Sequence, residues 1–166
     1  MTLKIESTAF AADGEIPVRY TGEGEDLSPP LSWSGVPSST KSLVLLVDDP
    51  DAPDPAAPKM VWVHWVLYNI PPSVTGLSEG VKSLPVGTGE GLNDWKRTGY
   101  GGPLPPIGRH RYFHKLYALD GCCQTKRAGA GFALAAFPIS GSSRRFLEQT
   151  QDKTRRPGTL DIRPFA

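Results

Sequence analysis

The sequence predicts a mainly β protein, built as a sandwich of two antiparallel sheets with few short helices. Residues 41–49 are apolar throughout their centre, and residues 61–70 are rich in β-branched and aromatic side chains. Turns rich in proline or glycine bound both runs, and no helical period is sustained before Asp120. A chain of 166 residues is long enough to form a single domain around one core.

The expected strands follow one another along the first half of the chain. Leu3 to Ser7 alternates apolar and polar residues, which predicts a short edge strand. Leu27 to Trp33 is expected to be extended, because a residue before proline is excluded from the helical region. Residues 41–49 predict a strand buried on both faces, and the proline-rich residues 49–58 predict a stiff loop after it. Residues 61–70 predict the second core strand.

Strict alternation of side chains assigns the faces of this second strand. One face would carry Trp62, His64, Val66 and Tyr68. The opposite face would carry Val63, Trp65 and Leu67.

Residues 99–120 combine a rigid loop with a third strand. The prolines in residues 99–108 fix backbone angles and remove amide donors, and the glycines disfavour regular structure, so this part is predicted to be neither helix nor sheet. Alternation then places His110, Tyr112 and His114 on one face. Arg111, Phe113 and Lys115 fall on the other face. A stiff loop that delivers an imidazole and a phenol to one surface predicts one wall of a small polar pocket.

Composition excludes several classes of protein. The formal net charge of +1 argues against a dedicated nucleic-acid binder. The sequence has neither an export signal nor about 18 consecutive apolar residues, so we expect a soluble protein with no transmembrane segment. The adjacent Cys122 and Cys123 predict no disulfide and no metal site, which favours a cytoplasmic location and no cofactor.

Charge and composition both change after Asp120. Residues 1–120 hold 10 basic and 14 acidic residues, a net charge of −4, whereas residues 121–166 hold 8 and 3, a net charge of +5. This tail is rich in Gly, Ala and Arg, and Arg144 to Lys153 is its best short helix candidate. We therefore predict a β-sandwich domain over residues 1–120 and a divergent C-terminal tail over residues 121–166.

Five polar residues stand beside the stiff loops and could form one site. Asp49 and Asp51 follow the first core strand, His64 lies in the second, and His110 and Tyr112 begin the third. Two imidazoles, a phenol and loop amides could donate several hydrogen bonds to an anion of phosphate size. A carboxylate about 4 Å from such an anion costs about 4 kcal/mol at an effective dielectric near 20. Each Asp must therefore accept from an imidazole N–H or meet a cationic part of the ligand.

Each of these residues also has a purely structural interpretation. A single His among aromatic residues is commonly a core residue, and Asp49-Pro50-Asp51 is a common turn. Their joint occurrence favours a non-catalytic protein that binds a phosphate-bearing small molecule. One alternative is a hydrolase that uses His64 and His110 with Asp49 or Asp51, although no Gly-x-Ser-x-Gly and no tight metal-ligand motif is present. Another is a protein that acts through its surface and keeps a vestigial pocket.

Four blocks of sequence support a family resemblance. They are Ser28-Pro29-Pro30-Leu31-Ser32-Trp33, Asp49-Pro50-Asp51-Ala52-Pro53, Trp62-Val63-His64-Trp65, and Gly99-Tyr100-Gly101-Gly102-Pro103 followed by His110-Arg111-Tyr112. In their order and spacing the chain resembles the phosphatidylethanolamine-binding protein family, also called the Raf kinase inhibitor protein family. Within it, the chain is most similar to the bacterial and archaeal YbhB/YbcL-like branch.

This resemblance implies a β-sandwich with a small pocket at one end that takes phosphate or a phosphorylated headgroup. The family's pocket positions fall on Asp49, Asp51, Pro53, Trp62, His64, Gly102, Pro103, His110 and Tyr112. It also implies a role as a regulator with a protein partner such as a kinase, and a homodimer in some members.

The sequence departs from the family in two places. His114 stands where the family commonly has an aromatic or aliphatic residue, and the usual helix and last strand are not recognisable after Asp120. We hypothesise that the tail reflects a change of reading frame in a GC-rich gene, which translation of the neighbouring frames beyond Asp120 tests. The alternative is a diverged, positively charged tail that contacts acidic lipid or protein.

Overall fold

The computed structural model describes residues 2–122 and 160–161. Its elements are β1 (Lys4–Glu6), the 3-10 helix η1 (Val18–Tyr20), β2 (Leu31–Ser34), β3 (Ser42–Ala52), β4 (Met60–Ile70), β5 (Gly76–Leu77), β6 (Gly89–Glu90), β7 (Arg111–Leu119) and β8 (Leu160–Asp161). No helix within the described residues is long and apolar enough to cross a membrane.

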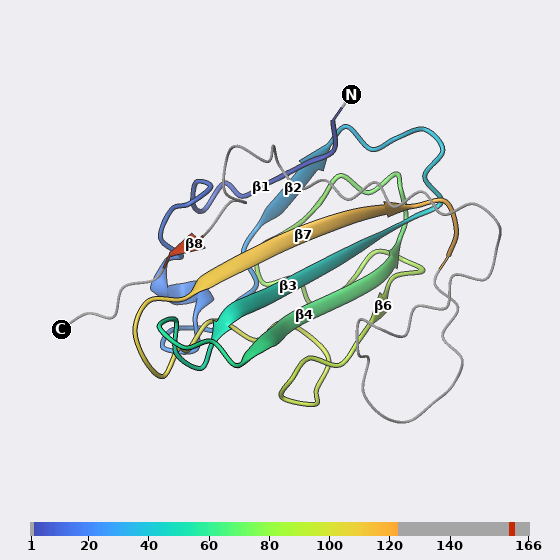
Figure 1. Ribbon diagram of the computed structural model, residues 1–166. Coiled ribbons are helices and arrows are strands. Elements are labelled where there is room, and N and C mark those ends of the chain that lie inside the picture. Colours follow the sequence, from blue (N-terminus) through green and yellow to red (C-terminus); the bar gives the residue numbers. More distant parts are fainter. Residues whose placement is uncertain (1, 123–159, 162–166) are drawn as a thin grey trace.

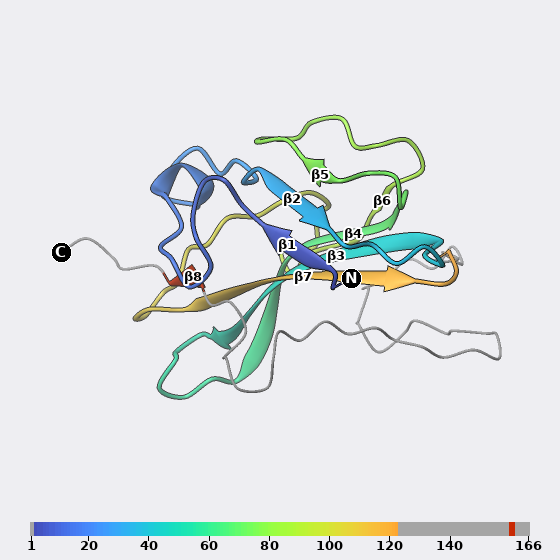
Figure 2. The ribbon, with the colours of Figure 1, turned by 90° about the horizontal axis from the view of Figure 1, so that it is seen from above.

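The strands form two antiparallel sheets that lie face to face. The smaller sheet has the order β1-β2-β5, and the larger has the order β6-β4-β3-β7-β8. Figure 1 looks onto the larger sheet, and Figure 2 shows the smaller sheet above it as a second layer. This is the predicted mainly β sandwich with little helix.

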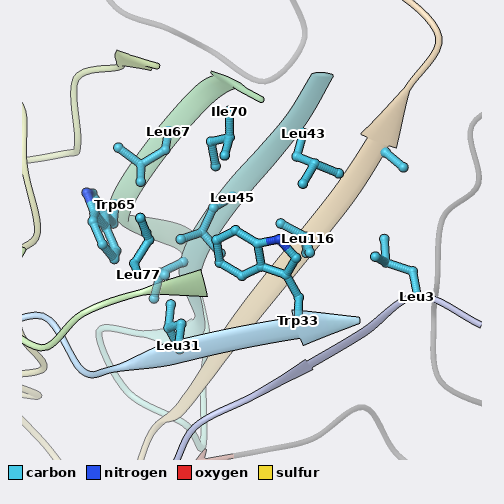
Figure 3. Close-up of a cluster of buried hydrophobic side chains, with 12 residues drawn as sticks. Leu3, Leu31, Trp33, Leu43, Leu45, Trp65, Leu67, Ile70, Leu77 and Leu116 are labelled. Atoms are coloured by element: carbon cyan, nitrogen blue, oxygen red, sulfur yellow. The ribbon is translucent and has the colours of Figure 1, made fainter. Parts of the chain in front are cut away.

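A cluster of apolar side chains fills the space between the two sheets (Figure 3). The smaller sheet contributes Leu31, Trp33 and Leu77. The larger sheet contributes Leu43, Leu45, Val47, Trp65, Leu67, Ile70, Leu116 and Ala118. Most of these side chains recur at every second position of a strand, because successive side chains point to opposite faces. A second, smaller cluster joins Ile16, Tyr20 and Tyr112 near η1.

The strand predictions hold, with two corrections to their ends. Residues 4–6 form the edge strand of the smaller sheet, and the buried strand predicted at 41–49 is β3. However, β3 continues to Ala52, through residues expected to begin a loop, because Ala52 still pairs with Met60 of β4. The third strand begins at Arg111, one residue after His110. The helix candidate at 144–153 lies outside the described residues.

A β-bulge in β4 overturns part of the predicted face of His64. Val47 pairs with Trp65, but the next residue, Asp48, pairs with Val63, so His64 is an extra residue without a partner across the ladder. A bulge bends a strand and re-aims its side chains. As a result, His64 packs against Tyr112 and, like Trp62, against Trp95, so its predicted face is shared with Trp62. Val66 and Tyr68 alternate with the core residues Trp65 and Leu67 and lie on the other face.

The alternation predicted for β7 is confirmed. Tyr112 is buried on the inner side. On the outer side, Phe113 lies between two cations, with Arg111 Cζ 5.8 Å and Lys115 Nζ 5.4 Å from the ring centroid. Lys115 Nζ also contacts Oδ2 of the buried Asp48 at 2.6 Å. Burial raises the pKa of Asp48, and Lys115 opposes that rise.

Several loops gather at one end of the sandwich. Figures 1 and 2 both place η1, the turn between β3 and β4, and the loop that leads into β7 at this end. The polar residues predicted to form a site belong to these loops or to the strands that meet them.

Candidate functional site

A buried carboxyl–imidazole pair lies at the base of the site. Asp49 Oδ2 is 2.6 Å from His110 Nδ1, and His110 Nε2 is 3.0 Å from the carbonyl oxygen of Ile107. A carbonyl only accepts hydrogen bonds, so Nε2 carries the proton donated to Ile107. The contact between Nδ1 and Asp49 is a second hydrogen bond, on the other nitrogen of the ring. The buried His110 therefore uses both ring nitrogens inside the protein.

The second carboxylate, Asp51, is held by an arginine. Arg111 Nε and Nη2 donate to the two oxygens of Asp51 at 2.8 and 2.6 Å, and the Arg111 amide adds a bond of 2.8 Å. Such a bidentate, charge-assisted pair fixes both side chains. These hydrogen bonds lower the pKa of Asp51, and Asp51 in turn raises the pKa of Arg111. Asp51 also donates its amide to Asp49 Oδ1 at 2.8 Å.

His64 is oriented by the loop before β7. Its Nδ1 donates to the carbonyl of Gly101 at 2.7 Å, and the Gly101 amide donates back to the His64 carbonyl at 3.1 Å. The fixed Nδ1–H leaves Nε2 as the acceptor of a neutral ring. Burial lowers the pKa of His64, which favours that neutral form. Nε2 makes no hydrogen bond to another described residue.

Aromatic rings enclose His64 on two sides. The centroids of Trp95 and Tyr112 lie 5.0 and 5.1 Å from that of His64, both in edge-to-face geometry. Trp62 packs edge-to-face on Trp95 at 5.4 Å and is partly exposed. Tyr112 stacks on His110 with ring centroids 6.5 Å apart. Burial raises the pKa of Tyr112, so its hydroxyl keeps its proton and remains a potential donor.

Two consecutive glycines let the loop pass close to these groups. A Cβ on Gly101 would lie 2.6 Å from the Trp95 ring, and one on Gly102 would lie 2.6 Å from Asp26 Oδ1. The Gly102 amide donates to the same Asp26 oxygen at 2.5 Å. The buried Pro103 accepts from the Gly22 amide at 2.8 Å, which ties this loop to the segment after η1.

Most of the predicted site residues meet in one cluster. Shared hydrogen bonds or ring contacts connect Asp49, Asp51, Trp62, His64, His110 and Tyr112, and the His64–Gly101 bonds bring Gly102 and Pro103 beside them. Pro53 differs: it follows a cis peptide bond just after β3 and is exposed. No hydrogen bond or ring contact links it to the cluster within residues 2–122.

Sequence reasoning missed four residues of the cluster. Gly101, Trp95, Arg111 and Asp26 each contact a predicted member directly. Arg111 was placed by alternation on the far face of β7, yet its long side chain still reaches Asp51. The Gly-Gly pair was a usable signal for close approach. Asp26 had none, because it lies 76 residues from Gly102 in the sequence.

The described part of the chain contains no group of three or more His, Cys, Asp or Glu side chains that could hold a metal ion. The carboxylates of Asp49 and Asp51, the candidate metal ligands of the hydrolase hypothesis, are bound to His110 and Arg111.

Comparison with known proteins places this geometry in a family. The chain matches the phosphatidylethanolamine-binding protein family over residues 6–155. It belongs to that family. A UPF0098 protein of Methanothermobacter thermautotrophicus is 54% identical over 121 residues, which are 71% of this chain and 77% of the relative. A UPF0098 protein of Pyrococcus horikoshii is 39% identical over 159 residues, or 92% of this chain and 70% of the relative.

Two solved structures of the family share the fold. One, described as a putative phosphatidylethanolamine-binding protein homologue from Chlamydia trachomatis, has a TM-score of 0.69 and 40% identity, covering 75% of this chain and 80% of that chain. The other is E. coli YbcL, described as a member of the mammalian family, with a TM-score of 0.65 and 34% identity. That match covers 73% of this chain and 79% of YbcL.

Proposed function

We propose that this protein is a non-catalytic binding protein whose cluster at the end of the sandwich takes a phosphate-bearing anion. The observation that carries the proposal is His64. It is buried, its Nδ1 is committed to Gly101, and its Nε2 has no partner within the described residues. The ring is held in place by one nitrogen, so the other nitrogen is positioned to form a hydrogen bond with a ligand.

Three groups around His64 are suited to an anion. A protonated Nε2 of His64, the Tyr112 hydroxyl and the Gly102 amide are all donors. They lie on β4, on β7 and on the loop before β7, and hydrogen bonds hold His64 and Gly102 in place. The ring of Trp95 covers His64 and would exclude water from a bound group. Asp49 and Asp51 act in this proposal as positioning residues, because their oxygens already accept from His110 and Arg111.

The hydrolase alternative is less well supported by the same contacts. A general base needs a free nitrogen directed at the reacting group. His64 Nε2 is such a nitrogen, but the carboxylates that would assist it are bound to His110 and Arg111. The Asp49–His110 pair has the form of a carboxyl-assisted base, but the second nitrogen of His110 is bonded to Ile107. In the part of the chain that the structure describes, no group of side chains could hold a metal ion that would activate a water molecule in place of a general base.

The wider role is proposed from family membership. Binding of a phosphorylated headgroup or side chain would allow the protein to act as a regulator of a partner such as a kinase, and a homodimer is a further expectation. We place this activity in the cytoplasm, because the adjacent Cys122 and Cys123 predict a reduced protein.

Histidine NMR spectra test the binding proposal directly. Inorganic phosphate and O-phosphoethanolamine are titrated separately into the full chain, and the ring resonances of His64 are followed. We expect saturable shifts at millimolar or lower concentration, and the ligand with the lower Kd identifies free phosphate or headgroup as the better source. His64 resonances that stay unmoved by both ligands would contradict the proposal. A His64→Gln variant, which cannot take up a proton at this position, should bind at least about tenfold more weakly, the effect of losing a charge-assisted hydrogen bond.

A further inference from the structure

The amide that the proposed site offers to an anion already binds a carboxylate of the protein itself. Asp26 Oδ1 accepts from the Gly102 N–H at 2.5 Å, although the two residues are 76 positions apart. Gly102 is buried, and its surroundings leave no room for even a methyl group beside Asp26 and Thr21. Asp26 therefore stands where an external anion on this amide would stand.

The side chain of Asp26 is also partly exposed and has a second partner at the surface. Its side chain is 38% exposed, and Oδ2 is 3.5 Å from Nη2 of the exposed Arg97. The backbone of Asp26 is held by a hydrogen bond, in which its amide donates to the Thr21 carbonyl at 3.2 Å, and it has a left-handed φ of 55°. Asp26 thus contacts Gly102 and Arg97 at once, and a rotation about its side-chain bonds can break the bond to Gly102 and keep the contact with Arg97 without moving the backbone.

Two anions do not share one amide in a partly buried site, because like charges at contact distance repel strongly there. We infer that Asp26 is an internal competitor for the anion site, which an incoming phosphate group must displace from Gly102 and which keeps Arg97 as its partner when displaced. Asp26 thereby sets the affinity of the site and keeps it closed to weakly binding anions. This inference rests on the proposed anion-binding function.

Two substitutions separate the charge of Asp26 from its shape. Asp26→Asn keeps the size of the side chain and tolerates positive φ, but it removes the charge. Asp26→Gly removes the side chain and is also compatible with positive φ. Glu25→Gln is the matched control, since it removes one negative charge from the neighbouring residue, whose partner is Arg19 rather than Gly102.

The experiment measures the Kd of inorganic phosphate, and separately of O-phosphoethanolamine, from the His64 resonances of the four full-length proteins. We expect Asp26→Asn and Asp26→Gly to bind about tenfold or more tightly than the parent, because one charge-assisted hydrogen bond no longer has to be broken. Glu25→Gln should stay within about twofold of the parent, since exposed charges are screened. In the parent, the Gly102 amide resonance should move together with those of His64.

The outcomes distinguish a failure of the competitor role of Asp26 from a failure of the proposed anion-binding function. If His64 responds in the parent but both Asp26 variants keep the parent Kd or bind more weakly, the competitor role is wrong and the anion site stands. An equal gain in affinity in Glu25→Gln would also overturn the inference, because the effect would then come from the net charge of the protein and not from the bond between Asp26 and Gly102. If His64 responds in none of the four proteins, the anion site itself fails.

Discussion

At the scale of single residues, the site consists of polar groups that satisfy one another. Asp49 binds His110, Asp51 binds Arg111, and His64 binds Gly101. Such groups are costly to bury alone but tolerable as pairs, so removal of one partner leaves the other uncompensated.

Asp49→Ala should lower the free energy of unfolding by about 3 kcal/mol, because His110 would remain buried without its carboxyl partner. Urea unfolding followed by circular dichroism measures the change. Glu23→Ala, an exposed acidic residue near η1, should change stability by less than about 0.5 kcal/mol. A loss for Asp49→Ala as small as that of the control would show that the pair contributes no stability.

Binding at His64 should be linked to pH. Burial keeps the pKa of the free imidazole below its ordinary value, and a bound anion would stabilise the imidazolium and raise that pKa. Binding then takes up a proton, so affinity should increase as the pH falls from about 8 to about 6. Calorimetry with sulfate, which does not titrate in this range, measures the slope. His64→Gln should abolish the slope, and a slope that persists in that variant would assign the proton to another group.

His114 is a half-buried histidine without a function in the proposed site. Its two ring nitrogens are inaccessible, make no hydrogen bond of good geometry within the described residues, and lie near Phe10. Burial lowers its pKa from 6.5 to about 4, so the unfolded chain binds a proton first as the pH falls. Stability should therefore be complete above about pH 6.5 and should fall by up to about 3 kcal/mol towards pH 4.

His114→Phe should remove most of this acid sensitivity and stabilise the protein near neutral pH, because no buried ring nitrogen remains unsatisfied. Urea midpoints of the parent and the variant across this pH range test it. Part of the pH dependence should remain, since the pKa of His64 is also lowered. Parallel pH curves for the two proteins would contradict the assignment.

At the scale of elements, the bulge in β4 and the loop at 99–108 decide where His64 points. Two core strands and their burial were predictable, because continuous apolar runs between turns specify them. The bulge was not, because one extra residue in a ladder depends on the pairing with β3, which lies outside any local pattern. The face that His64 would share with Val66 and Tyr68 was therefore predicted wrongly, although its place beside Trp62 and Tyr112 was predicted.

The close approach of the loop to Trp95 gives a prediction of its own. Gly101→Ala places a methyl group 2.6 Å from the Trp95 ring, so the ring must move away from His64. We expect changed tryptophan fluorescence and phosphate binding weakened by about tenfold or more, equivalent to about 1.4 kcal/mol. Gly121→Ala, whose Cβ would meet nothing within 4 Å, is the control and should bind as the parent does. Equal binding by the two variants would show that Trp95 has no part in the site.

At the scale of the whole molecule, the sandwich separates an apolar centre from a polar end. The two sheets enclose the main cluster, and the loops gather where the strands end (Figures 1 and 2). The fold class and most residues of the candidate cluster were predictable, because alternation and family motifs are local in sequence. Contacts across long separations, such as Asp26 with Gly102, were not. A sandwich domain over residues 1–120 with a divergent tail remains our proposal, and β8 shows that residues 160–161 pair with β7.

The cations on the outer side of β7 also restrict how that strand can slide. A shift of two residues along β3 would preserve every inside–outside assignment, so hydrophobic patterning alone permits it. However, such a shift would break the ion pairs of Lys115 with Asp48 and of Arg111 with Asp51. Both buried carboxylates would then lack a cationic partner. The two ion pairs, at a fixed spacing along the strands, therefore select a single register of β7 on β3. In that register Tyr112 contacts His64.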